Sequence, residues 1–187
     1  GPQMWLTTLW HMGSGLPWAW KQGPAADSER MHVRELLPLL PPASLLVADA
    51  GFAGFDLLNM ILDAGHSFLF RVGGNVRLLT QLGRVELHGE DTVWLWPQGR
   101  RKEQPLVLRL VVLRREGRCV YLITNLSEDR LGHRQAAALY GMRWGVEVFY
   151  RSLKQTLEHR VMRSRAPAQA QAELAWSLVG LQLMGLM

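Results

Sequence analysis

The residues best suited to chemistry lie in the last third of the chain, where Tyr140, Arg143, Glu147 and Lys154 follow one another at helical spacing. At 100° per residue, these four side chains fall within a stripe of about 60° on one helix. An apolar face adjoins the stripe and is made of Leu139, Val146, Phe149, Leu153 and Leu157. A carboxylate oxygen is the kind of ligand that Mg²⁺ prefers, and guanidinium groups match phosphate oxygens. The stripe therefore combines one metal-binding group with phosphate-binding groups.

A salt-bridged solvent face is the alternative interpretation of the same stripe. Arg143 and Arg151 each lie four residues from Glu147, so either could pair with it along the helix surface. On spacing alone, the ordinary helix surface is the simpler explanation, and both interpretations stay open.

Asp49 is a second candidate. It follows the apolar run 44–48 (SLLVA), which is typical of a strand buried on both faces, and it precedes Ala50-Gly51-Phe52. In open α/β sheets, ligand-binding groups emerge at the carboxyl ends of strands. An Asp before a Gly also forms ordinary turns, so Asp49 alone leaves this alternative open.

Together these residues resemble the DDE transposases of the insertion-sequence-four family. The segment LYGMRWGVEVFYRSLKQTL carries the spaced Tyr, Arg, Glu and Lys signature of that family, and VADAGFAGFDLL resembles the motif around its second aspartate. The resemblance covers nearly the whole chain. It implies that Asp49 and Glu147 are catalytic carboxylates that bind divalent metal, Mg²⁺ or Mn²⁺, in a two-metal site. The implied activity is phosphodiester cleavage and strand transfer in DNA transposition.

The resemblance also implies DNA-binding roles. Arg143 and Lys154 would hold backbone phosphates, and the Tyr140 phenol would add a donor there; a core-edge aromatic is the alternative for Tyr140. Trp94 and Trp96 alternate on one strand face, where a family relative would stack a flipped base. A small hydrophobic core is the alternative that we favour for this pair. The implied partners are transposon ends and target DNA, with a homodimer in the active complex.

The elements that must position these residues follow from local patterns. The segments 4–12 and 16–21 indicate a hairpin around Gly13-Ser14-Gly15. Helices are expected at 29–40, at 53–64 with Phe55, Leu58 and Leu62 on one side, from 134 to about 159, and from about 167. Strands are expected at 44–48 and 67–72, followed by a β-rich stretch over 73–125.

The resemblance implies an α/β fold, a ribonuclease H-like mixed sheet with flanking helices and a β-rich insertion, and this element order agrees with it. We expect residues 1–72 to form the N-terminal part of the core, 73–125 the insertion, and 126–187 the helical part with Glu147. The resemblance places the family's first catalytic aspartate on a strand before the hairpin. Asp27 sits in a helix-capping context and does not take that role, so we expect these residues alone to be inactive and to fold poorly.

Composition and charge limit the other possibilities. The chain has 187 residues, 48% of them apolar, and its single Cys119 excludes a disulfide framework. Residues 97–165 carry a net charge of +9 and the rest −4, which favours a phosphate-bearing partner but also suits a solvated surface. No apolar run reaches the roughly 18 residues of a membrane span. With no visible signal peptide, we expect a cytoplasmic, nucleoid-associated protein without a membrane partner.

Two rival functions stay open. One is a DNA-binding remnant or domesticated transposase with the same fold and no catalysis. The other is a structural or membrane-surface protein built on the apolar C-terminal helix, but no Lys or Arg follows Arg165 to give that helix a basic face.

Overall fold

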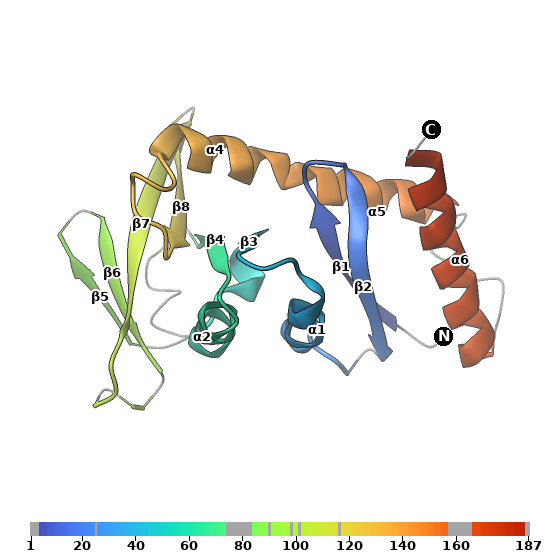
Figure 1. Cartoon of the computed structure of the whole chain (residues 1–187), viewed down its shortest axis with the longest axis horizontal. Helices are drawn as coiled ribbons and strands as arrows, with labels where there is room; N and C mark the ends of the chain where they lie inside the picture. The colour runs from blue at the N-terminus through green and yellow to red at the C-terminus, as the bar shows by residue number, and fades with distance from the viewer. Residues whose placement is uncertain are drawn as a thin grey trace. The chain divides into compact units, whose positions relative to one another are not determined.

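The computed structural model describes residues 4–24, 26–73, 84–89, 91–97, 99–100, 102–115, 117–156 and 166–185. Two compact units make up the chain (Figure 1). Unit 1 comprises Gly1–Leu36 and Met142–Met187, and unit 2 comprises Leu37–Gly141. Each unit is described below by itself.

Unit 1 begins with the expected hairpin. Strand β1 (Met4–His11) pairs antiparallel with β2 (Leu16–Pro24), with a register shift between Leu9 and Trp10. Helix α1 (Glu29–Leu36) follows, and Ser28 Oγ caps it by accepting the Met31 amide at 3.3 Å. The helix is shorter than predicted, because a 3₁₀ turn, η1 (Leu37–Leu39), takes over before the prolines.

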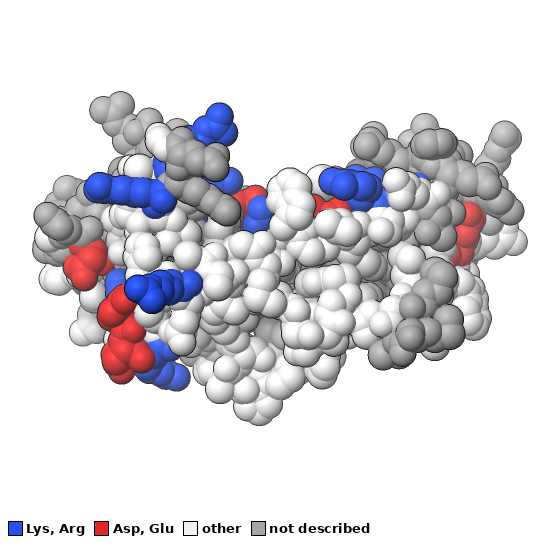
Figure 2. Space-filling model, turned by 90° about the horizontal axis from the view of Figure 1, so that it is seen from above, with Lys and Arg blue, Asp and Glu red and all other residues white. Residues whose placement is uncertain are grey.

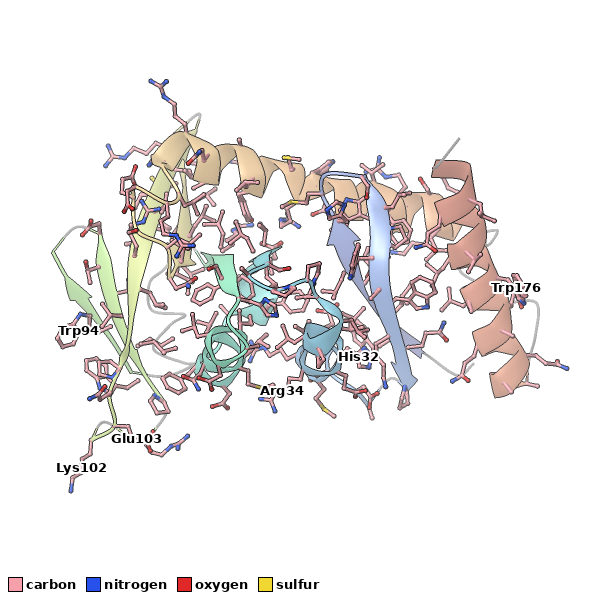
Figure 3. The ribbon with its side chains drawn as sticks, viewed as in Figure 1. His32, Arg34, Trp94, Lys102, Glu103 and Trp176 are labelled. Atoms are coloured by element: carbon pink, nitrogen blue, oxygen red, sulfur yellow. The ribbon has the colours of Figure 1, made fainter. Side chains whose placement is uncertain are left out.

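Two further helices complete unit 1: α5 (Trp144–Thr156) and α6 (Pro167–Gly185). Their buried residues form one core with the hairpin: Phe149, Leu153, Leu174 and Leu178, packed against Leu6, Trp10 and Trp20. Two other tryptophans of the hairpin, Trp5 and Trp18, are 43% and 49% exposed. Trp176 on α6 is 74% exposed (Figure 3), so part of the apolar surface of this helix lies outside that core.

Unit 2 is built on a six-stranded mixed sheet in the order β3-β4-β8-β7-β6-β5. The strands are β3 (Leu45–Ala48), β4 (Ser67–Val72), β5 (Arg84–His88), β6 (Thr92–Trp96), β7 (Leu106–Arg115) and β8 (Arg118–Thr124). Strands β3 and β4 are parallel, because α2 (Phe55–Asp63) crosses between them. The β-rich stretch joins this sheet directly through the pairing of β4 with β8. The division into 1–72, 73–125 and 126–187 stays a prediction.

Helix α4 (His133–Met142) covers one face of the sheet, and α2 lies on the other side of β4 (Figure 1). The core under α4 contains Leu69, Val111 and Leu122, and Leu45 and Val47 of β3 pack against it. This arrangement of a mixed sheet with flanking helices confirms the predicted fold class and is consistent with a ribonuclease H-like transposase domain.

Three sequence expectations need correction. The strand expected to be buried on both faces is only half-buried over Leu45–Ala48, because β3 is a terminal strand of the sheet and pairs with β4 alone among the described residues. The buried face of α2 is formed by Leu57, Leu58 and Ile61, whereas Phe55 and Leu62 are only half-buried. The helix expected from 134 to about 159 is two helices, and residues 157–159 lie outside the described residues.

The break between α4 and α5 falls at Arg143, which adopts a turn conformation. Gly141 and Gly145 flank it, and glycine costs about 1 kcal/mol relative to alanine inside a helix. Tyr140 therefore lies on α4, whereas Glu147 and Lys154 lie on α5, so the four signature residues do not share one uninterrupted helix.

Candidate active site

Asp49 stands directly after β3 with an extended backbone, φ −83° and ψ 173°. It occupies the N-cap position of a 3₁₀ turn, η2 (Ala50–Phe52), but its side chain makes no capping hydrogen bond. The carboxylate is directed instead toward two side chains from elsewhere in unit 2 and is 41% exposed. The sequence left open that the Asp49 side chain only stabilises a turn. In the structure this side chain instead contacts two side chains of unit 2.

The first of these partners is Tyr140, whose hydroxyl donates a hydrogen bond to Asp49 Oδ1 at 3.0 Å. The Tyr140 ring packs at the margin of the core beneath α4, beside Leu139. The sequence left a core-edge position and a polar role as alternatives for Tyr140. In the structure, the Tyr140 ring occupies the core-edge position. Its hydroxyl has the polar role, but it donates to a carboxylate of its own chain.

The second partner is Arg71 on β4, whose Nη1 lies 3.6 Å from Asp49 Oδ1. The parallel register pairs Ala48 with Phe70, so the next residue on each strand, Asp49 and Arg71, falls side by side. Sequence reasoning missed Arg71. The signal was present, because Arg71 is the one charged residue in the mostly apolar segment 67–72.

Arg109 holds the segment that leads into α4. Its guanidinium donates to the Leu126 carbonyl at 3.0 Å and to the Leu131 carbonyl, and it pairs with Glu128. Burial lowers the pKa of Arg109, with Asp91 and Asp129 acting in the opposite direction. Through these contacts Arg109 fixes where α4 begins, and α4 carries Tyr140 to Asp49.

The remaining signature residues belong to the second half of the motif. Arg143 Nη1 lies 2.9 Å from Glu147 Oε1, so the ion pair expected of a salt-bridged face is present. The two side chains differ in exposure, at 15% for Arg143 and 38% for Glu147, and Lys154 is exposed. Glu147 thus presents a partly solvent-accessible carboxylate beside a largely buried guanidinium.

Helix α5 is held against the hairpin of its own unit. A Cβ on Gly145 would lie 3.1 Å from Trp10 Nε1, so only glycine permits this close approach without a shift of the indole. The Phe149 and Trp10 ring centroids are 5.0 Å apart, and the Tyr150 hydroxyl donates to the Leu6 carbonyl at 3.1 Å. Burial raises the pKa of the Tyr150 phenol above its ordinary value. These contacts set the orientation from which Glu147 projects.

Trp94, which is labelled in Figure 3, lies on the same side of β6 as Trp96, and the two ring centroids are 5.9 Å apart. Trp96 is 7% exposed, whereas Trp94 is half-buried. The alternation seen in the sequence therefore does place the two rings together. Their contact fits a small apolar cluster, with Trp94 as its more accessible member.

The described residues contain no group of three or more His, Cys, Asp or Glu that could hold a metal ion. Within the same part of the chain, no helix is both long and apolar enough to cross a membrane.

Comparison with known proteins agrees with these features. The family described as Transposase DDE domain matches residues 7–182. Transposase InsG for insertion sequence element IS4, from Escherichia coli (strain K12), is 28% identical over 201 residues, which cover 98% of this chain and 45% of that protein. The chain thus spans less than half the length of this relative. The match of the family across both compact units shows that the chain belongs to the DDE transposases of the IS4 type.

Proposed function

We propose that this chain forms the catalytic domain of a DNA transposase that cleaves phosphodiester bonds at transposon ends and joins them to target DNA. The observation that carries this proposal is the Asp49 carboxylate at the end of β3, oriented by Tyr140 and left unused as a helix cap. Membership of the DDE transposase family and the spacing of Arg143, Glu147 and Lys154 support it.

The proposed metal ligands are Asp49 and Glu147. Both are carboxylates of intermediate exposure, and hard oxygen donors of this kind suit Mg²⁺ or Mn²⁺. Each lies beside an arginine of its own unit, Arg71 for Asp49 and Arg143 for Glu147. When bound, divalent cations supply stabilisation of the charge on the attacking and leaving oxygens of the phosphodiester.

The side chains around these carboxylates have distinct proposed tasks. Tyr140 keeps Asp49 in one orientation, because a hydrogen bond from its hydroxyl restricts rotation of the carboxylate. Arg71 and Arg143 balance the carboxylates in the free protein, and their proposed task with DNA is to bind backbone phosphates. Lys154 is exposed and would add a further phosphate contact. Trp94, the more accessible ring of its pair, would offer a stacking surface for a base.

The test uses the full-length protein with Asp49→Asn and Glu147→Gln, each of which removes a charge but little volume. On supercoiled plasmid carrying the cognate ends, with Mg²⁺ present, nicking should fall by about a thousandfold, the equivalent of roughly 4 kcal/mol. DNA binding should remain. Asp63→Asn is the matched control, because Asp63 is an exposed carboxylate at the end of α2.

Nicking by Asp49→Asn at the wild-type rate would end the assignment of that residue. If both variants bind DNA and the wild-type protein does not cut it, a non-catalytic DNA-binding protein becomes the better description. A homodimer in the active complex is also part of the proposal, and sedimentation of the protein with and without its terminal DNA checks it.

A further inference from the structure

The turn between β7 and β8 carries a concentration of arginines. Arg114, Arg115 and Arg118 lie within five positions, with Glu116 as the only acid among them in the sequence. The register pairs Arg115 directly with Arg118 across the two strands. Like charges at directly opposite positions generally destabilise a strand pair. A bound anion would offset that effect.

The strand register shows which face this arginine pair occupies. Val111 and Leu113 on β7, and Val120 and Leu122 on β8, all pack into the core beneath α4. Because successive positions of a strand alternate between its faces, position 118 lies two residues before Val120 on the same face, and its cross-strand partner position 115 shares that face. Arg114 and its partner Cys119 occupy the opposite face.

The same alternation applies to the candidate active site. Asp49 lies two positions beyond Val47, and Arg71 two positions beyond Leu69, and both of those apolar residues belong to the core beneath α4. The contact of Asp49 with Tyr140 of α4 agrees with this assignment. Asp49, Arg71 and the cross-strand arginine pair therefore share one face of one sheet.

They also lie toward the same end of the strands of that sheet. Arg71 pairs with Leu122 on β8, and Arg118 lies four residues from Leu122 toward the turn. At about 3.3 Å per residue, the β7–β8 turn projects about 13 Å beyond the level of Arg71. It does so in the direction in which β3 and β4 end, because β4 and β8 are antiparallel. Arg118 is exposed, and Figure 2 shows Lys and Arg side chains over the part of unit 2 that holds these strands.

We propose that Arg118 and its cross-strand partner Arg115 form a clamp for the phosphate backbone of duplex DNA, beside the phosphodiester held at Asp49. This inference rests on the proposed function, since it takes the substrate of Asp49 to be DNA. Guanidinium groups donate in a fork that matches phosphate oxygens, and two of them across a strand pair can engage neighbouring phosphates. Contacts of this kind set the position of the duplex and read no sequence.

The experiment measures binding of the full-length protein to a fluorescent DNA duplex of arbitrary sequence, by anisotropy, over a range of salt concentrations. The double substitution Arg115→Gln and Arg118→Gln should reduce the slope of log affinity against log salt by about two, and Arg118→Gln alone by about one. Arg114→Gln is the matched control: it removes the same charge from the same hairpin on the opposite face, and should leave the slope unchanged.

A second variant separates binding from folding. Arg118→Glu converts the like-charge pair into an opposite-charge pair, so the melting temperature of the free protein should rise while DNA affinity falls. A fall in melting temperature, or unchanged DNA affinity, would overturn the clamp. So would a slope for Arg114→Gln reduced as much as that for Arg118→Gln.

The outcome is independent of catalysis. Asp49→Asn in the same binding assay should keep the wild-type salt slope while losing nicking. If Asp49→Asn nicks normally, the proposed function fails and the clamp can still be judged from its own slopes. If the arginine variants bind as the wild type does, the clamp fails and the carboxylate assignment stands.

Discussion

The Tyr140 hydroxyl donates to Asp49 Oδ1 across 3.0 Å, although the two residues are 91 positions apart in the chain. The bond joins α4 to the end of β3, and it is made by two residues that belong to separate motifs of the sequence. An aspartate that follows a four-residue strand has little local support for its side chain. The phenol supplies that support from the helix that lies over the same face of the sheet.

The first prediction concerns this bond. Tyr140→Phe keeps the ring and removes only the donor, so the core beneath α4 should persist while Asp49 loses its fixed orientation. Hydrogen bonds to charged groups contribute about 1.5–3 kcal/mol, which corresponds to a loss of roughly tenfold to a hundredfold in the nicking rate. The Mg²⁺ concentration needed for half-maximal nicking should also rise. Tyr121→Phe removes a phenol from β8 at a position on the face opposite to Leu122 and the core beneath α4, and is the control. Wild-type nicking and Mg²⁺ dependence in Tyr140→Phe would refute the positioning role.

The second prediction separates the two cations of the signature. Lys154 is exposed, whereas the Arg143 side chain is 15% exposed and pairs with Glu147. Lys154→Gln should weaken binding to terminal DNA and lower the salt slope by about one, with no change in melting temperature. Arg143→Gln should lower the melting temperature as well, because it leaves Glu147 without this partner. If Lys154→Gln leaves the salt slope unchanged, its proposed phosphate contact is wrong.

Local patterns predicted most of unit 2. The strand expected at 67–72 coincides with β4, and the place of Asp49 at a strand end is confirmed. Both were predictable because a short apolar run bounded by a turn is a local signal. The sequence marks Arg71 as the one charged residue of its segment, but it does not show that Asp49 is its partner. That contact depends on the parallel pairing of Ala48 with Phe70, which no local pattern specifies.

The break at Arg143 could not be placed because the signature spacing fits one continuous helix. The glycines on either side weaken the helix only slightly, and an isolated glycine is tolerated in many helices. The close approach of Gly145 to Trp10 depends on how α5 packs against the hairpin. The exposure of Trp5, Trp18 and Trp176 was not predictable for a similar reason. Composition alone does not show which aromatic side chains a small unit can bury.

The third prediction concerns a buried polar network in unit 1. His32 is 1% exposed, its Nδ1 is hydrogen-bonded to Thr7 Oγ1 at 2.9 Å, and its Nε2 lies 3.2 Å from Asp27 Oδ2 (Figure 3). A Cβ on Gly23 would overlap the Asp27 carboxylate and lie 2.5 Å from His32 Nε2. Gly23→Ala should therefore separate this pair and destabilise the protein by about 1–3 kcal/mol.

Thermal or urea unfolding measures that effect. The control is Gly180→Ala, because nothing lies within 4 Å of a Cβ at this position inside α6. There the substitution should raise stability by roughly 0.5–1 kcal/mol, since alanine favours helix more than glycine does. Equal melting temperatures for Gly23→Ala and the wild type would show that the network tolerates the methyl group.

The fourth prediction follows from Tyr150. Burial raises the pKa of its phenol above the ordinary value of 10.0. Below pH 10 the phenol is protonated in both the folded and the unfolded chain, and its contribution does not change with pH. Between pH 10 and the raised pKa, the unfolded chain loses a proton that the folded chain keeps. The unfolded chain then binds fewer protons, so the free energy of unfolding must fall as pH rises through this window.

Tyr150→Phe tests this, because phenylalanine has no proton to lose. At neutral pH the variant should be less stable by about 1 kcal/mol, since the bond to the Leu6 carbonyl is gone. Above pH 10 its stability should fall less steeply than that of the wild type, so the two curves converge. Phe149→Leu, a packing change in the same core, should instead lower stability by the same amount at every pH. Urea unfolding from neutral pH to about pH 11 gives all three curves, and parallel curves for Tyr150→Phe and the wild type would contradict a buried phenol at this position.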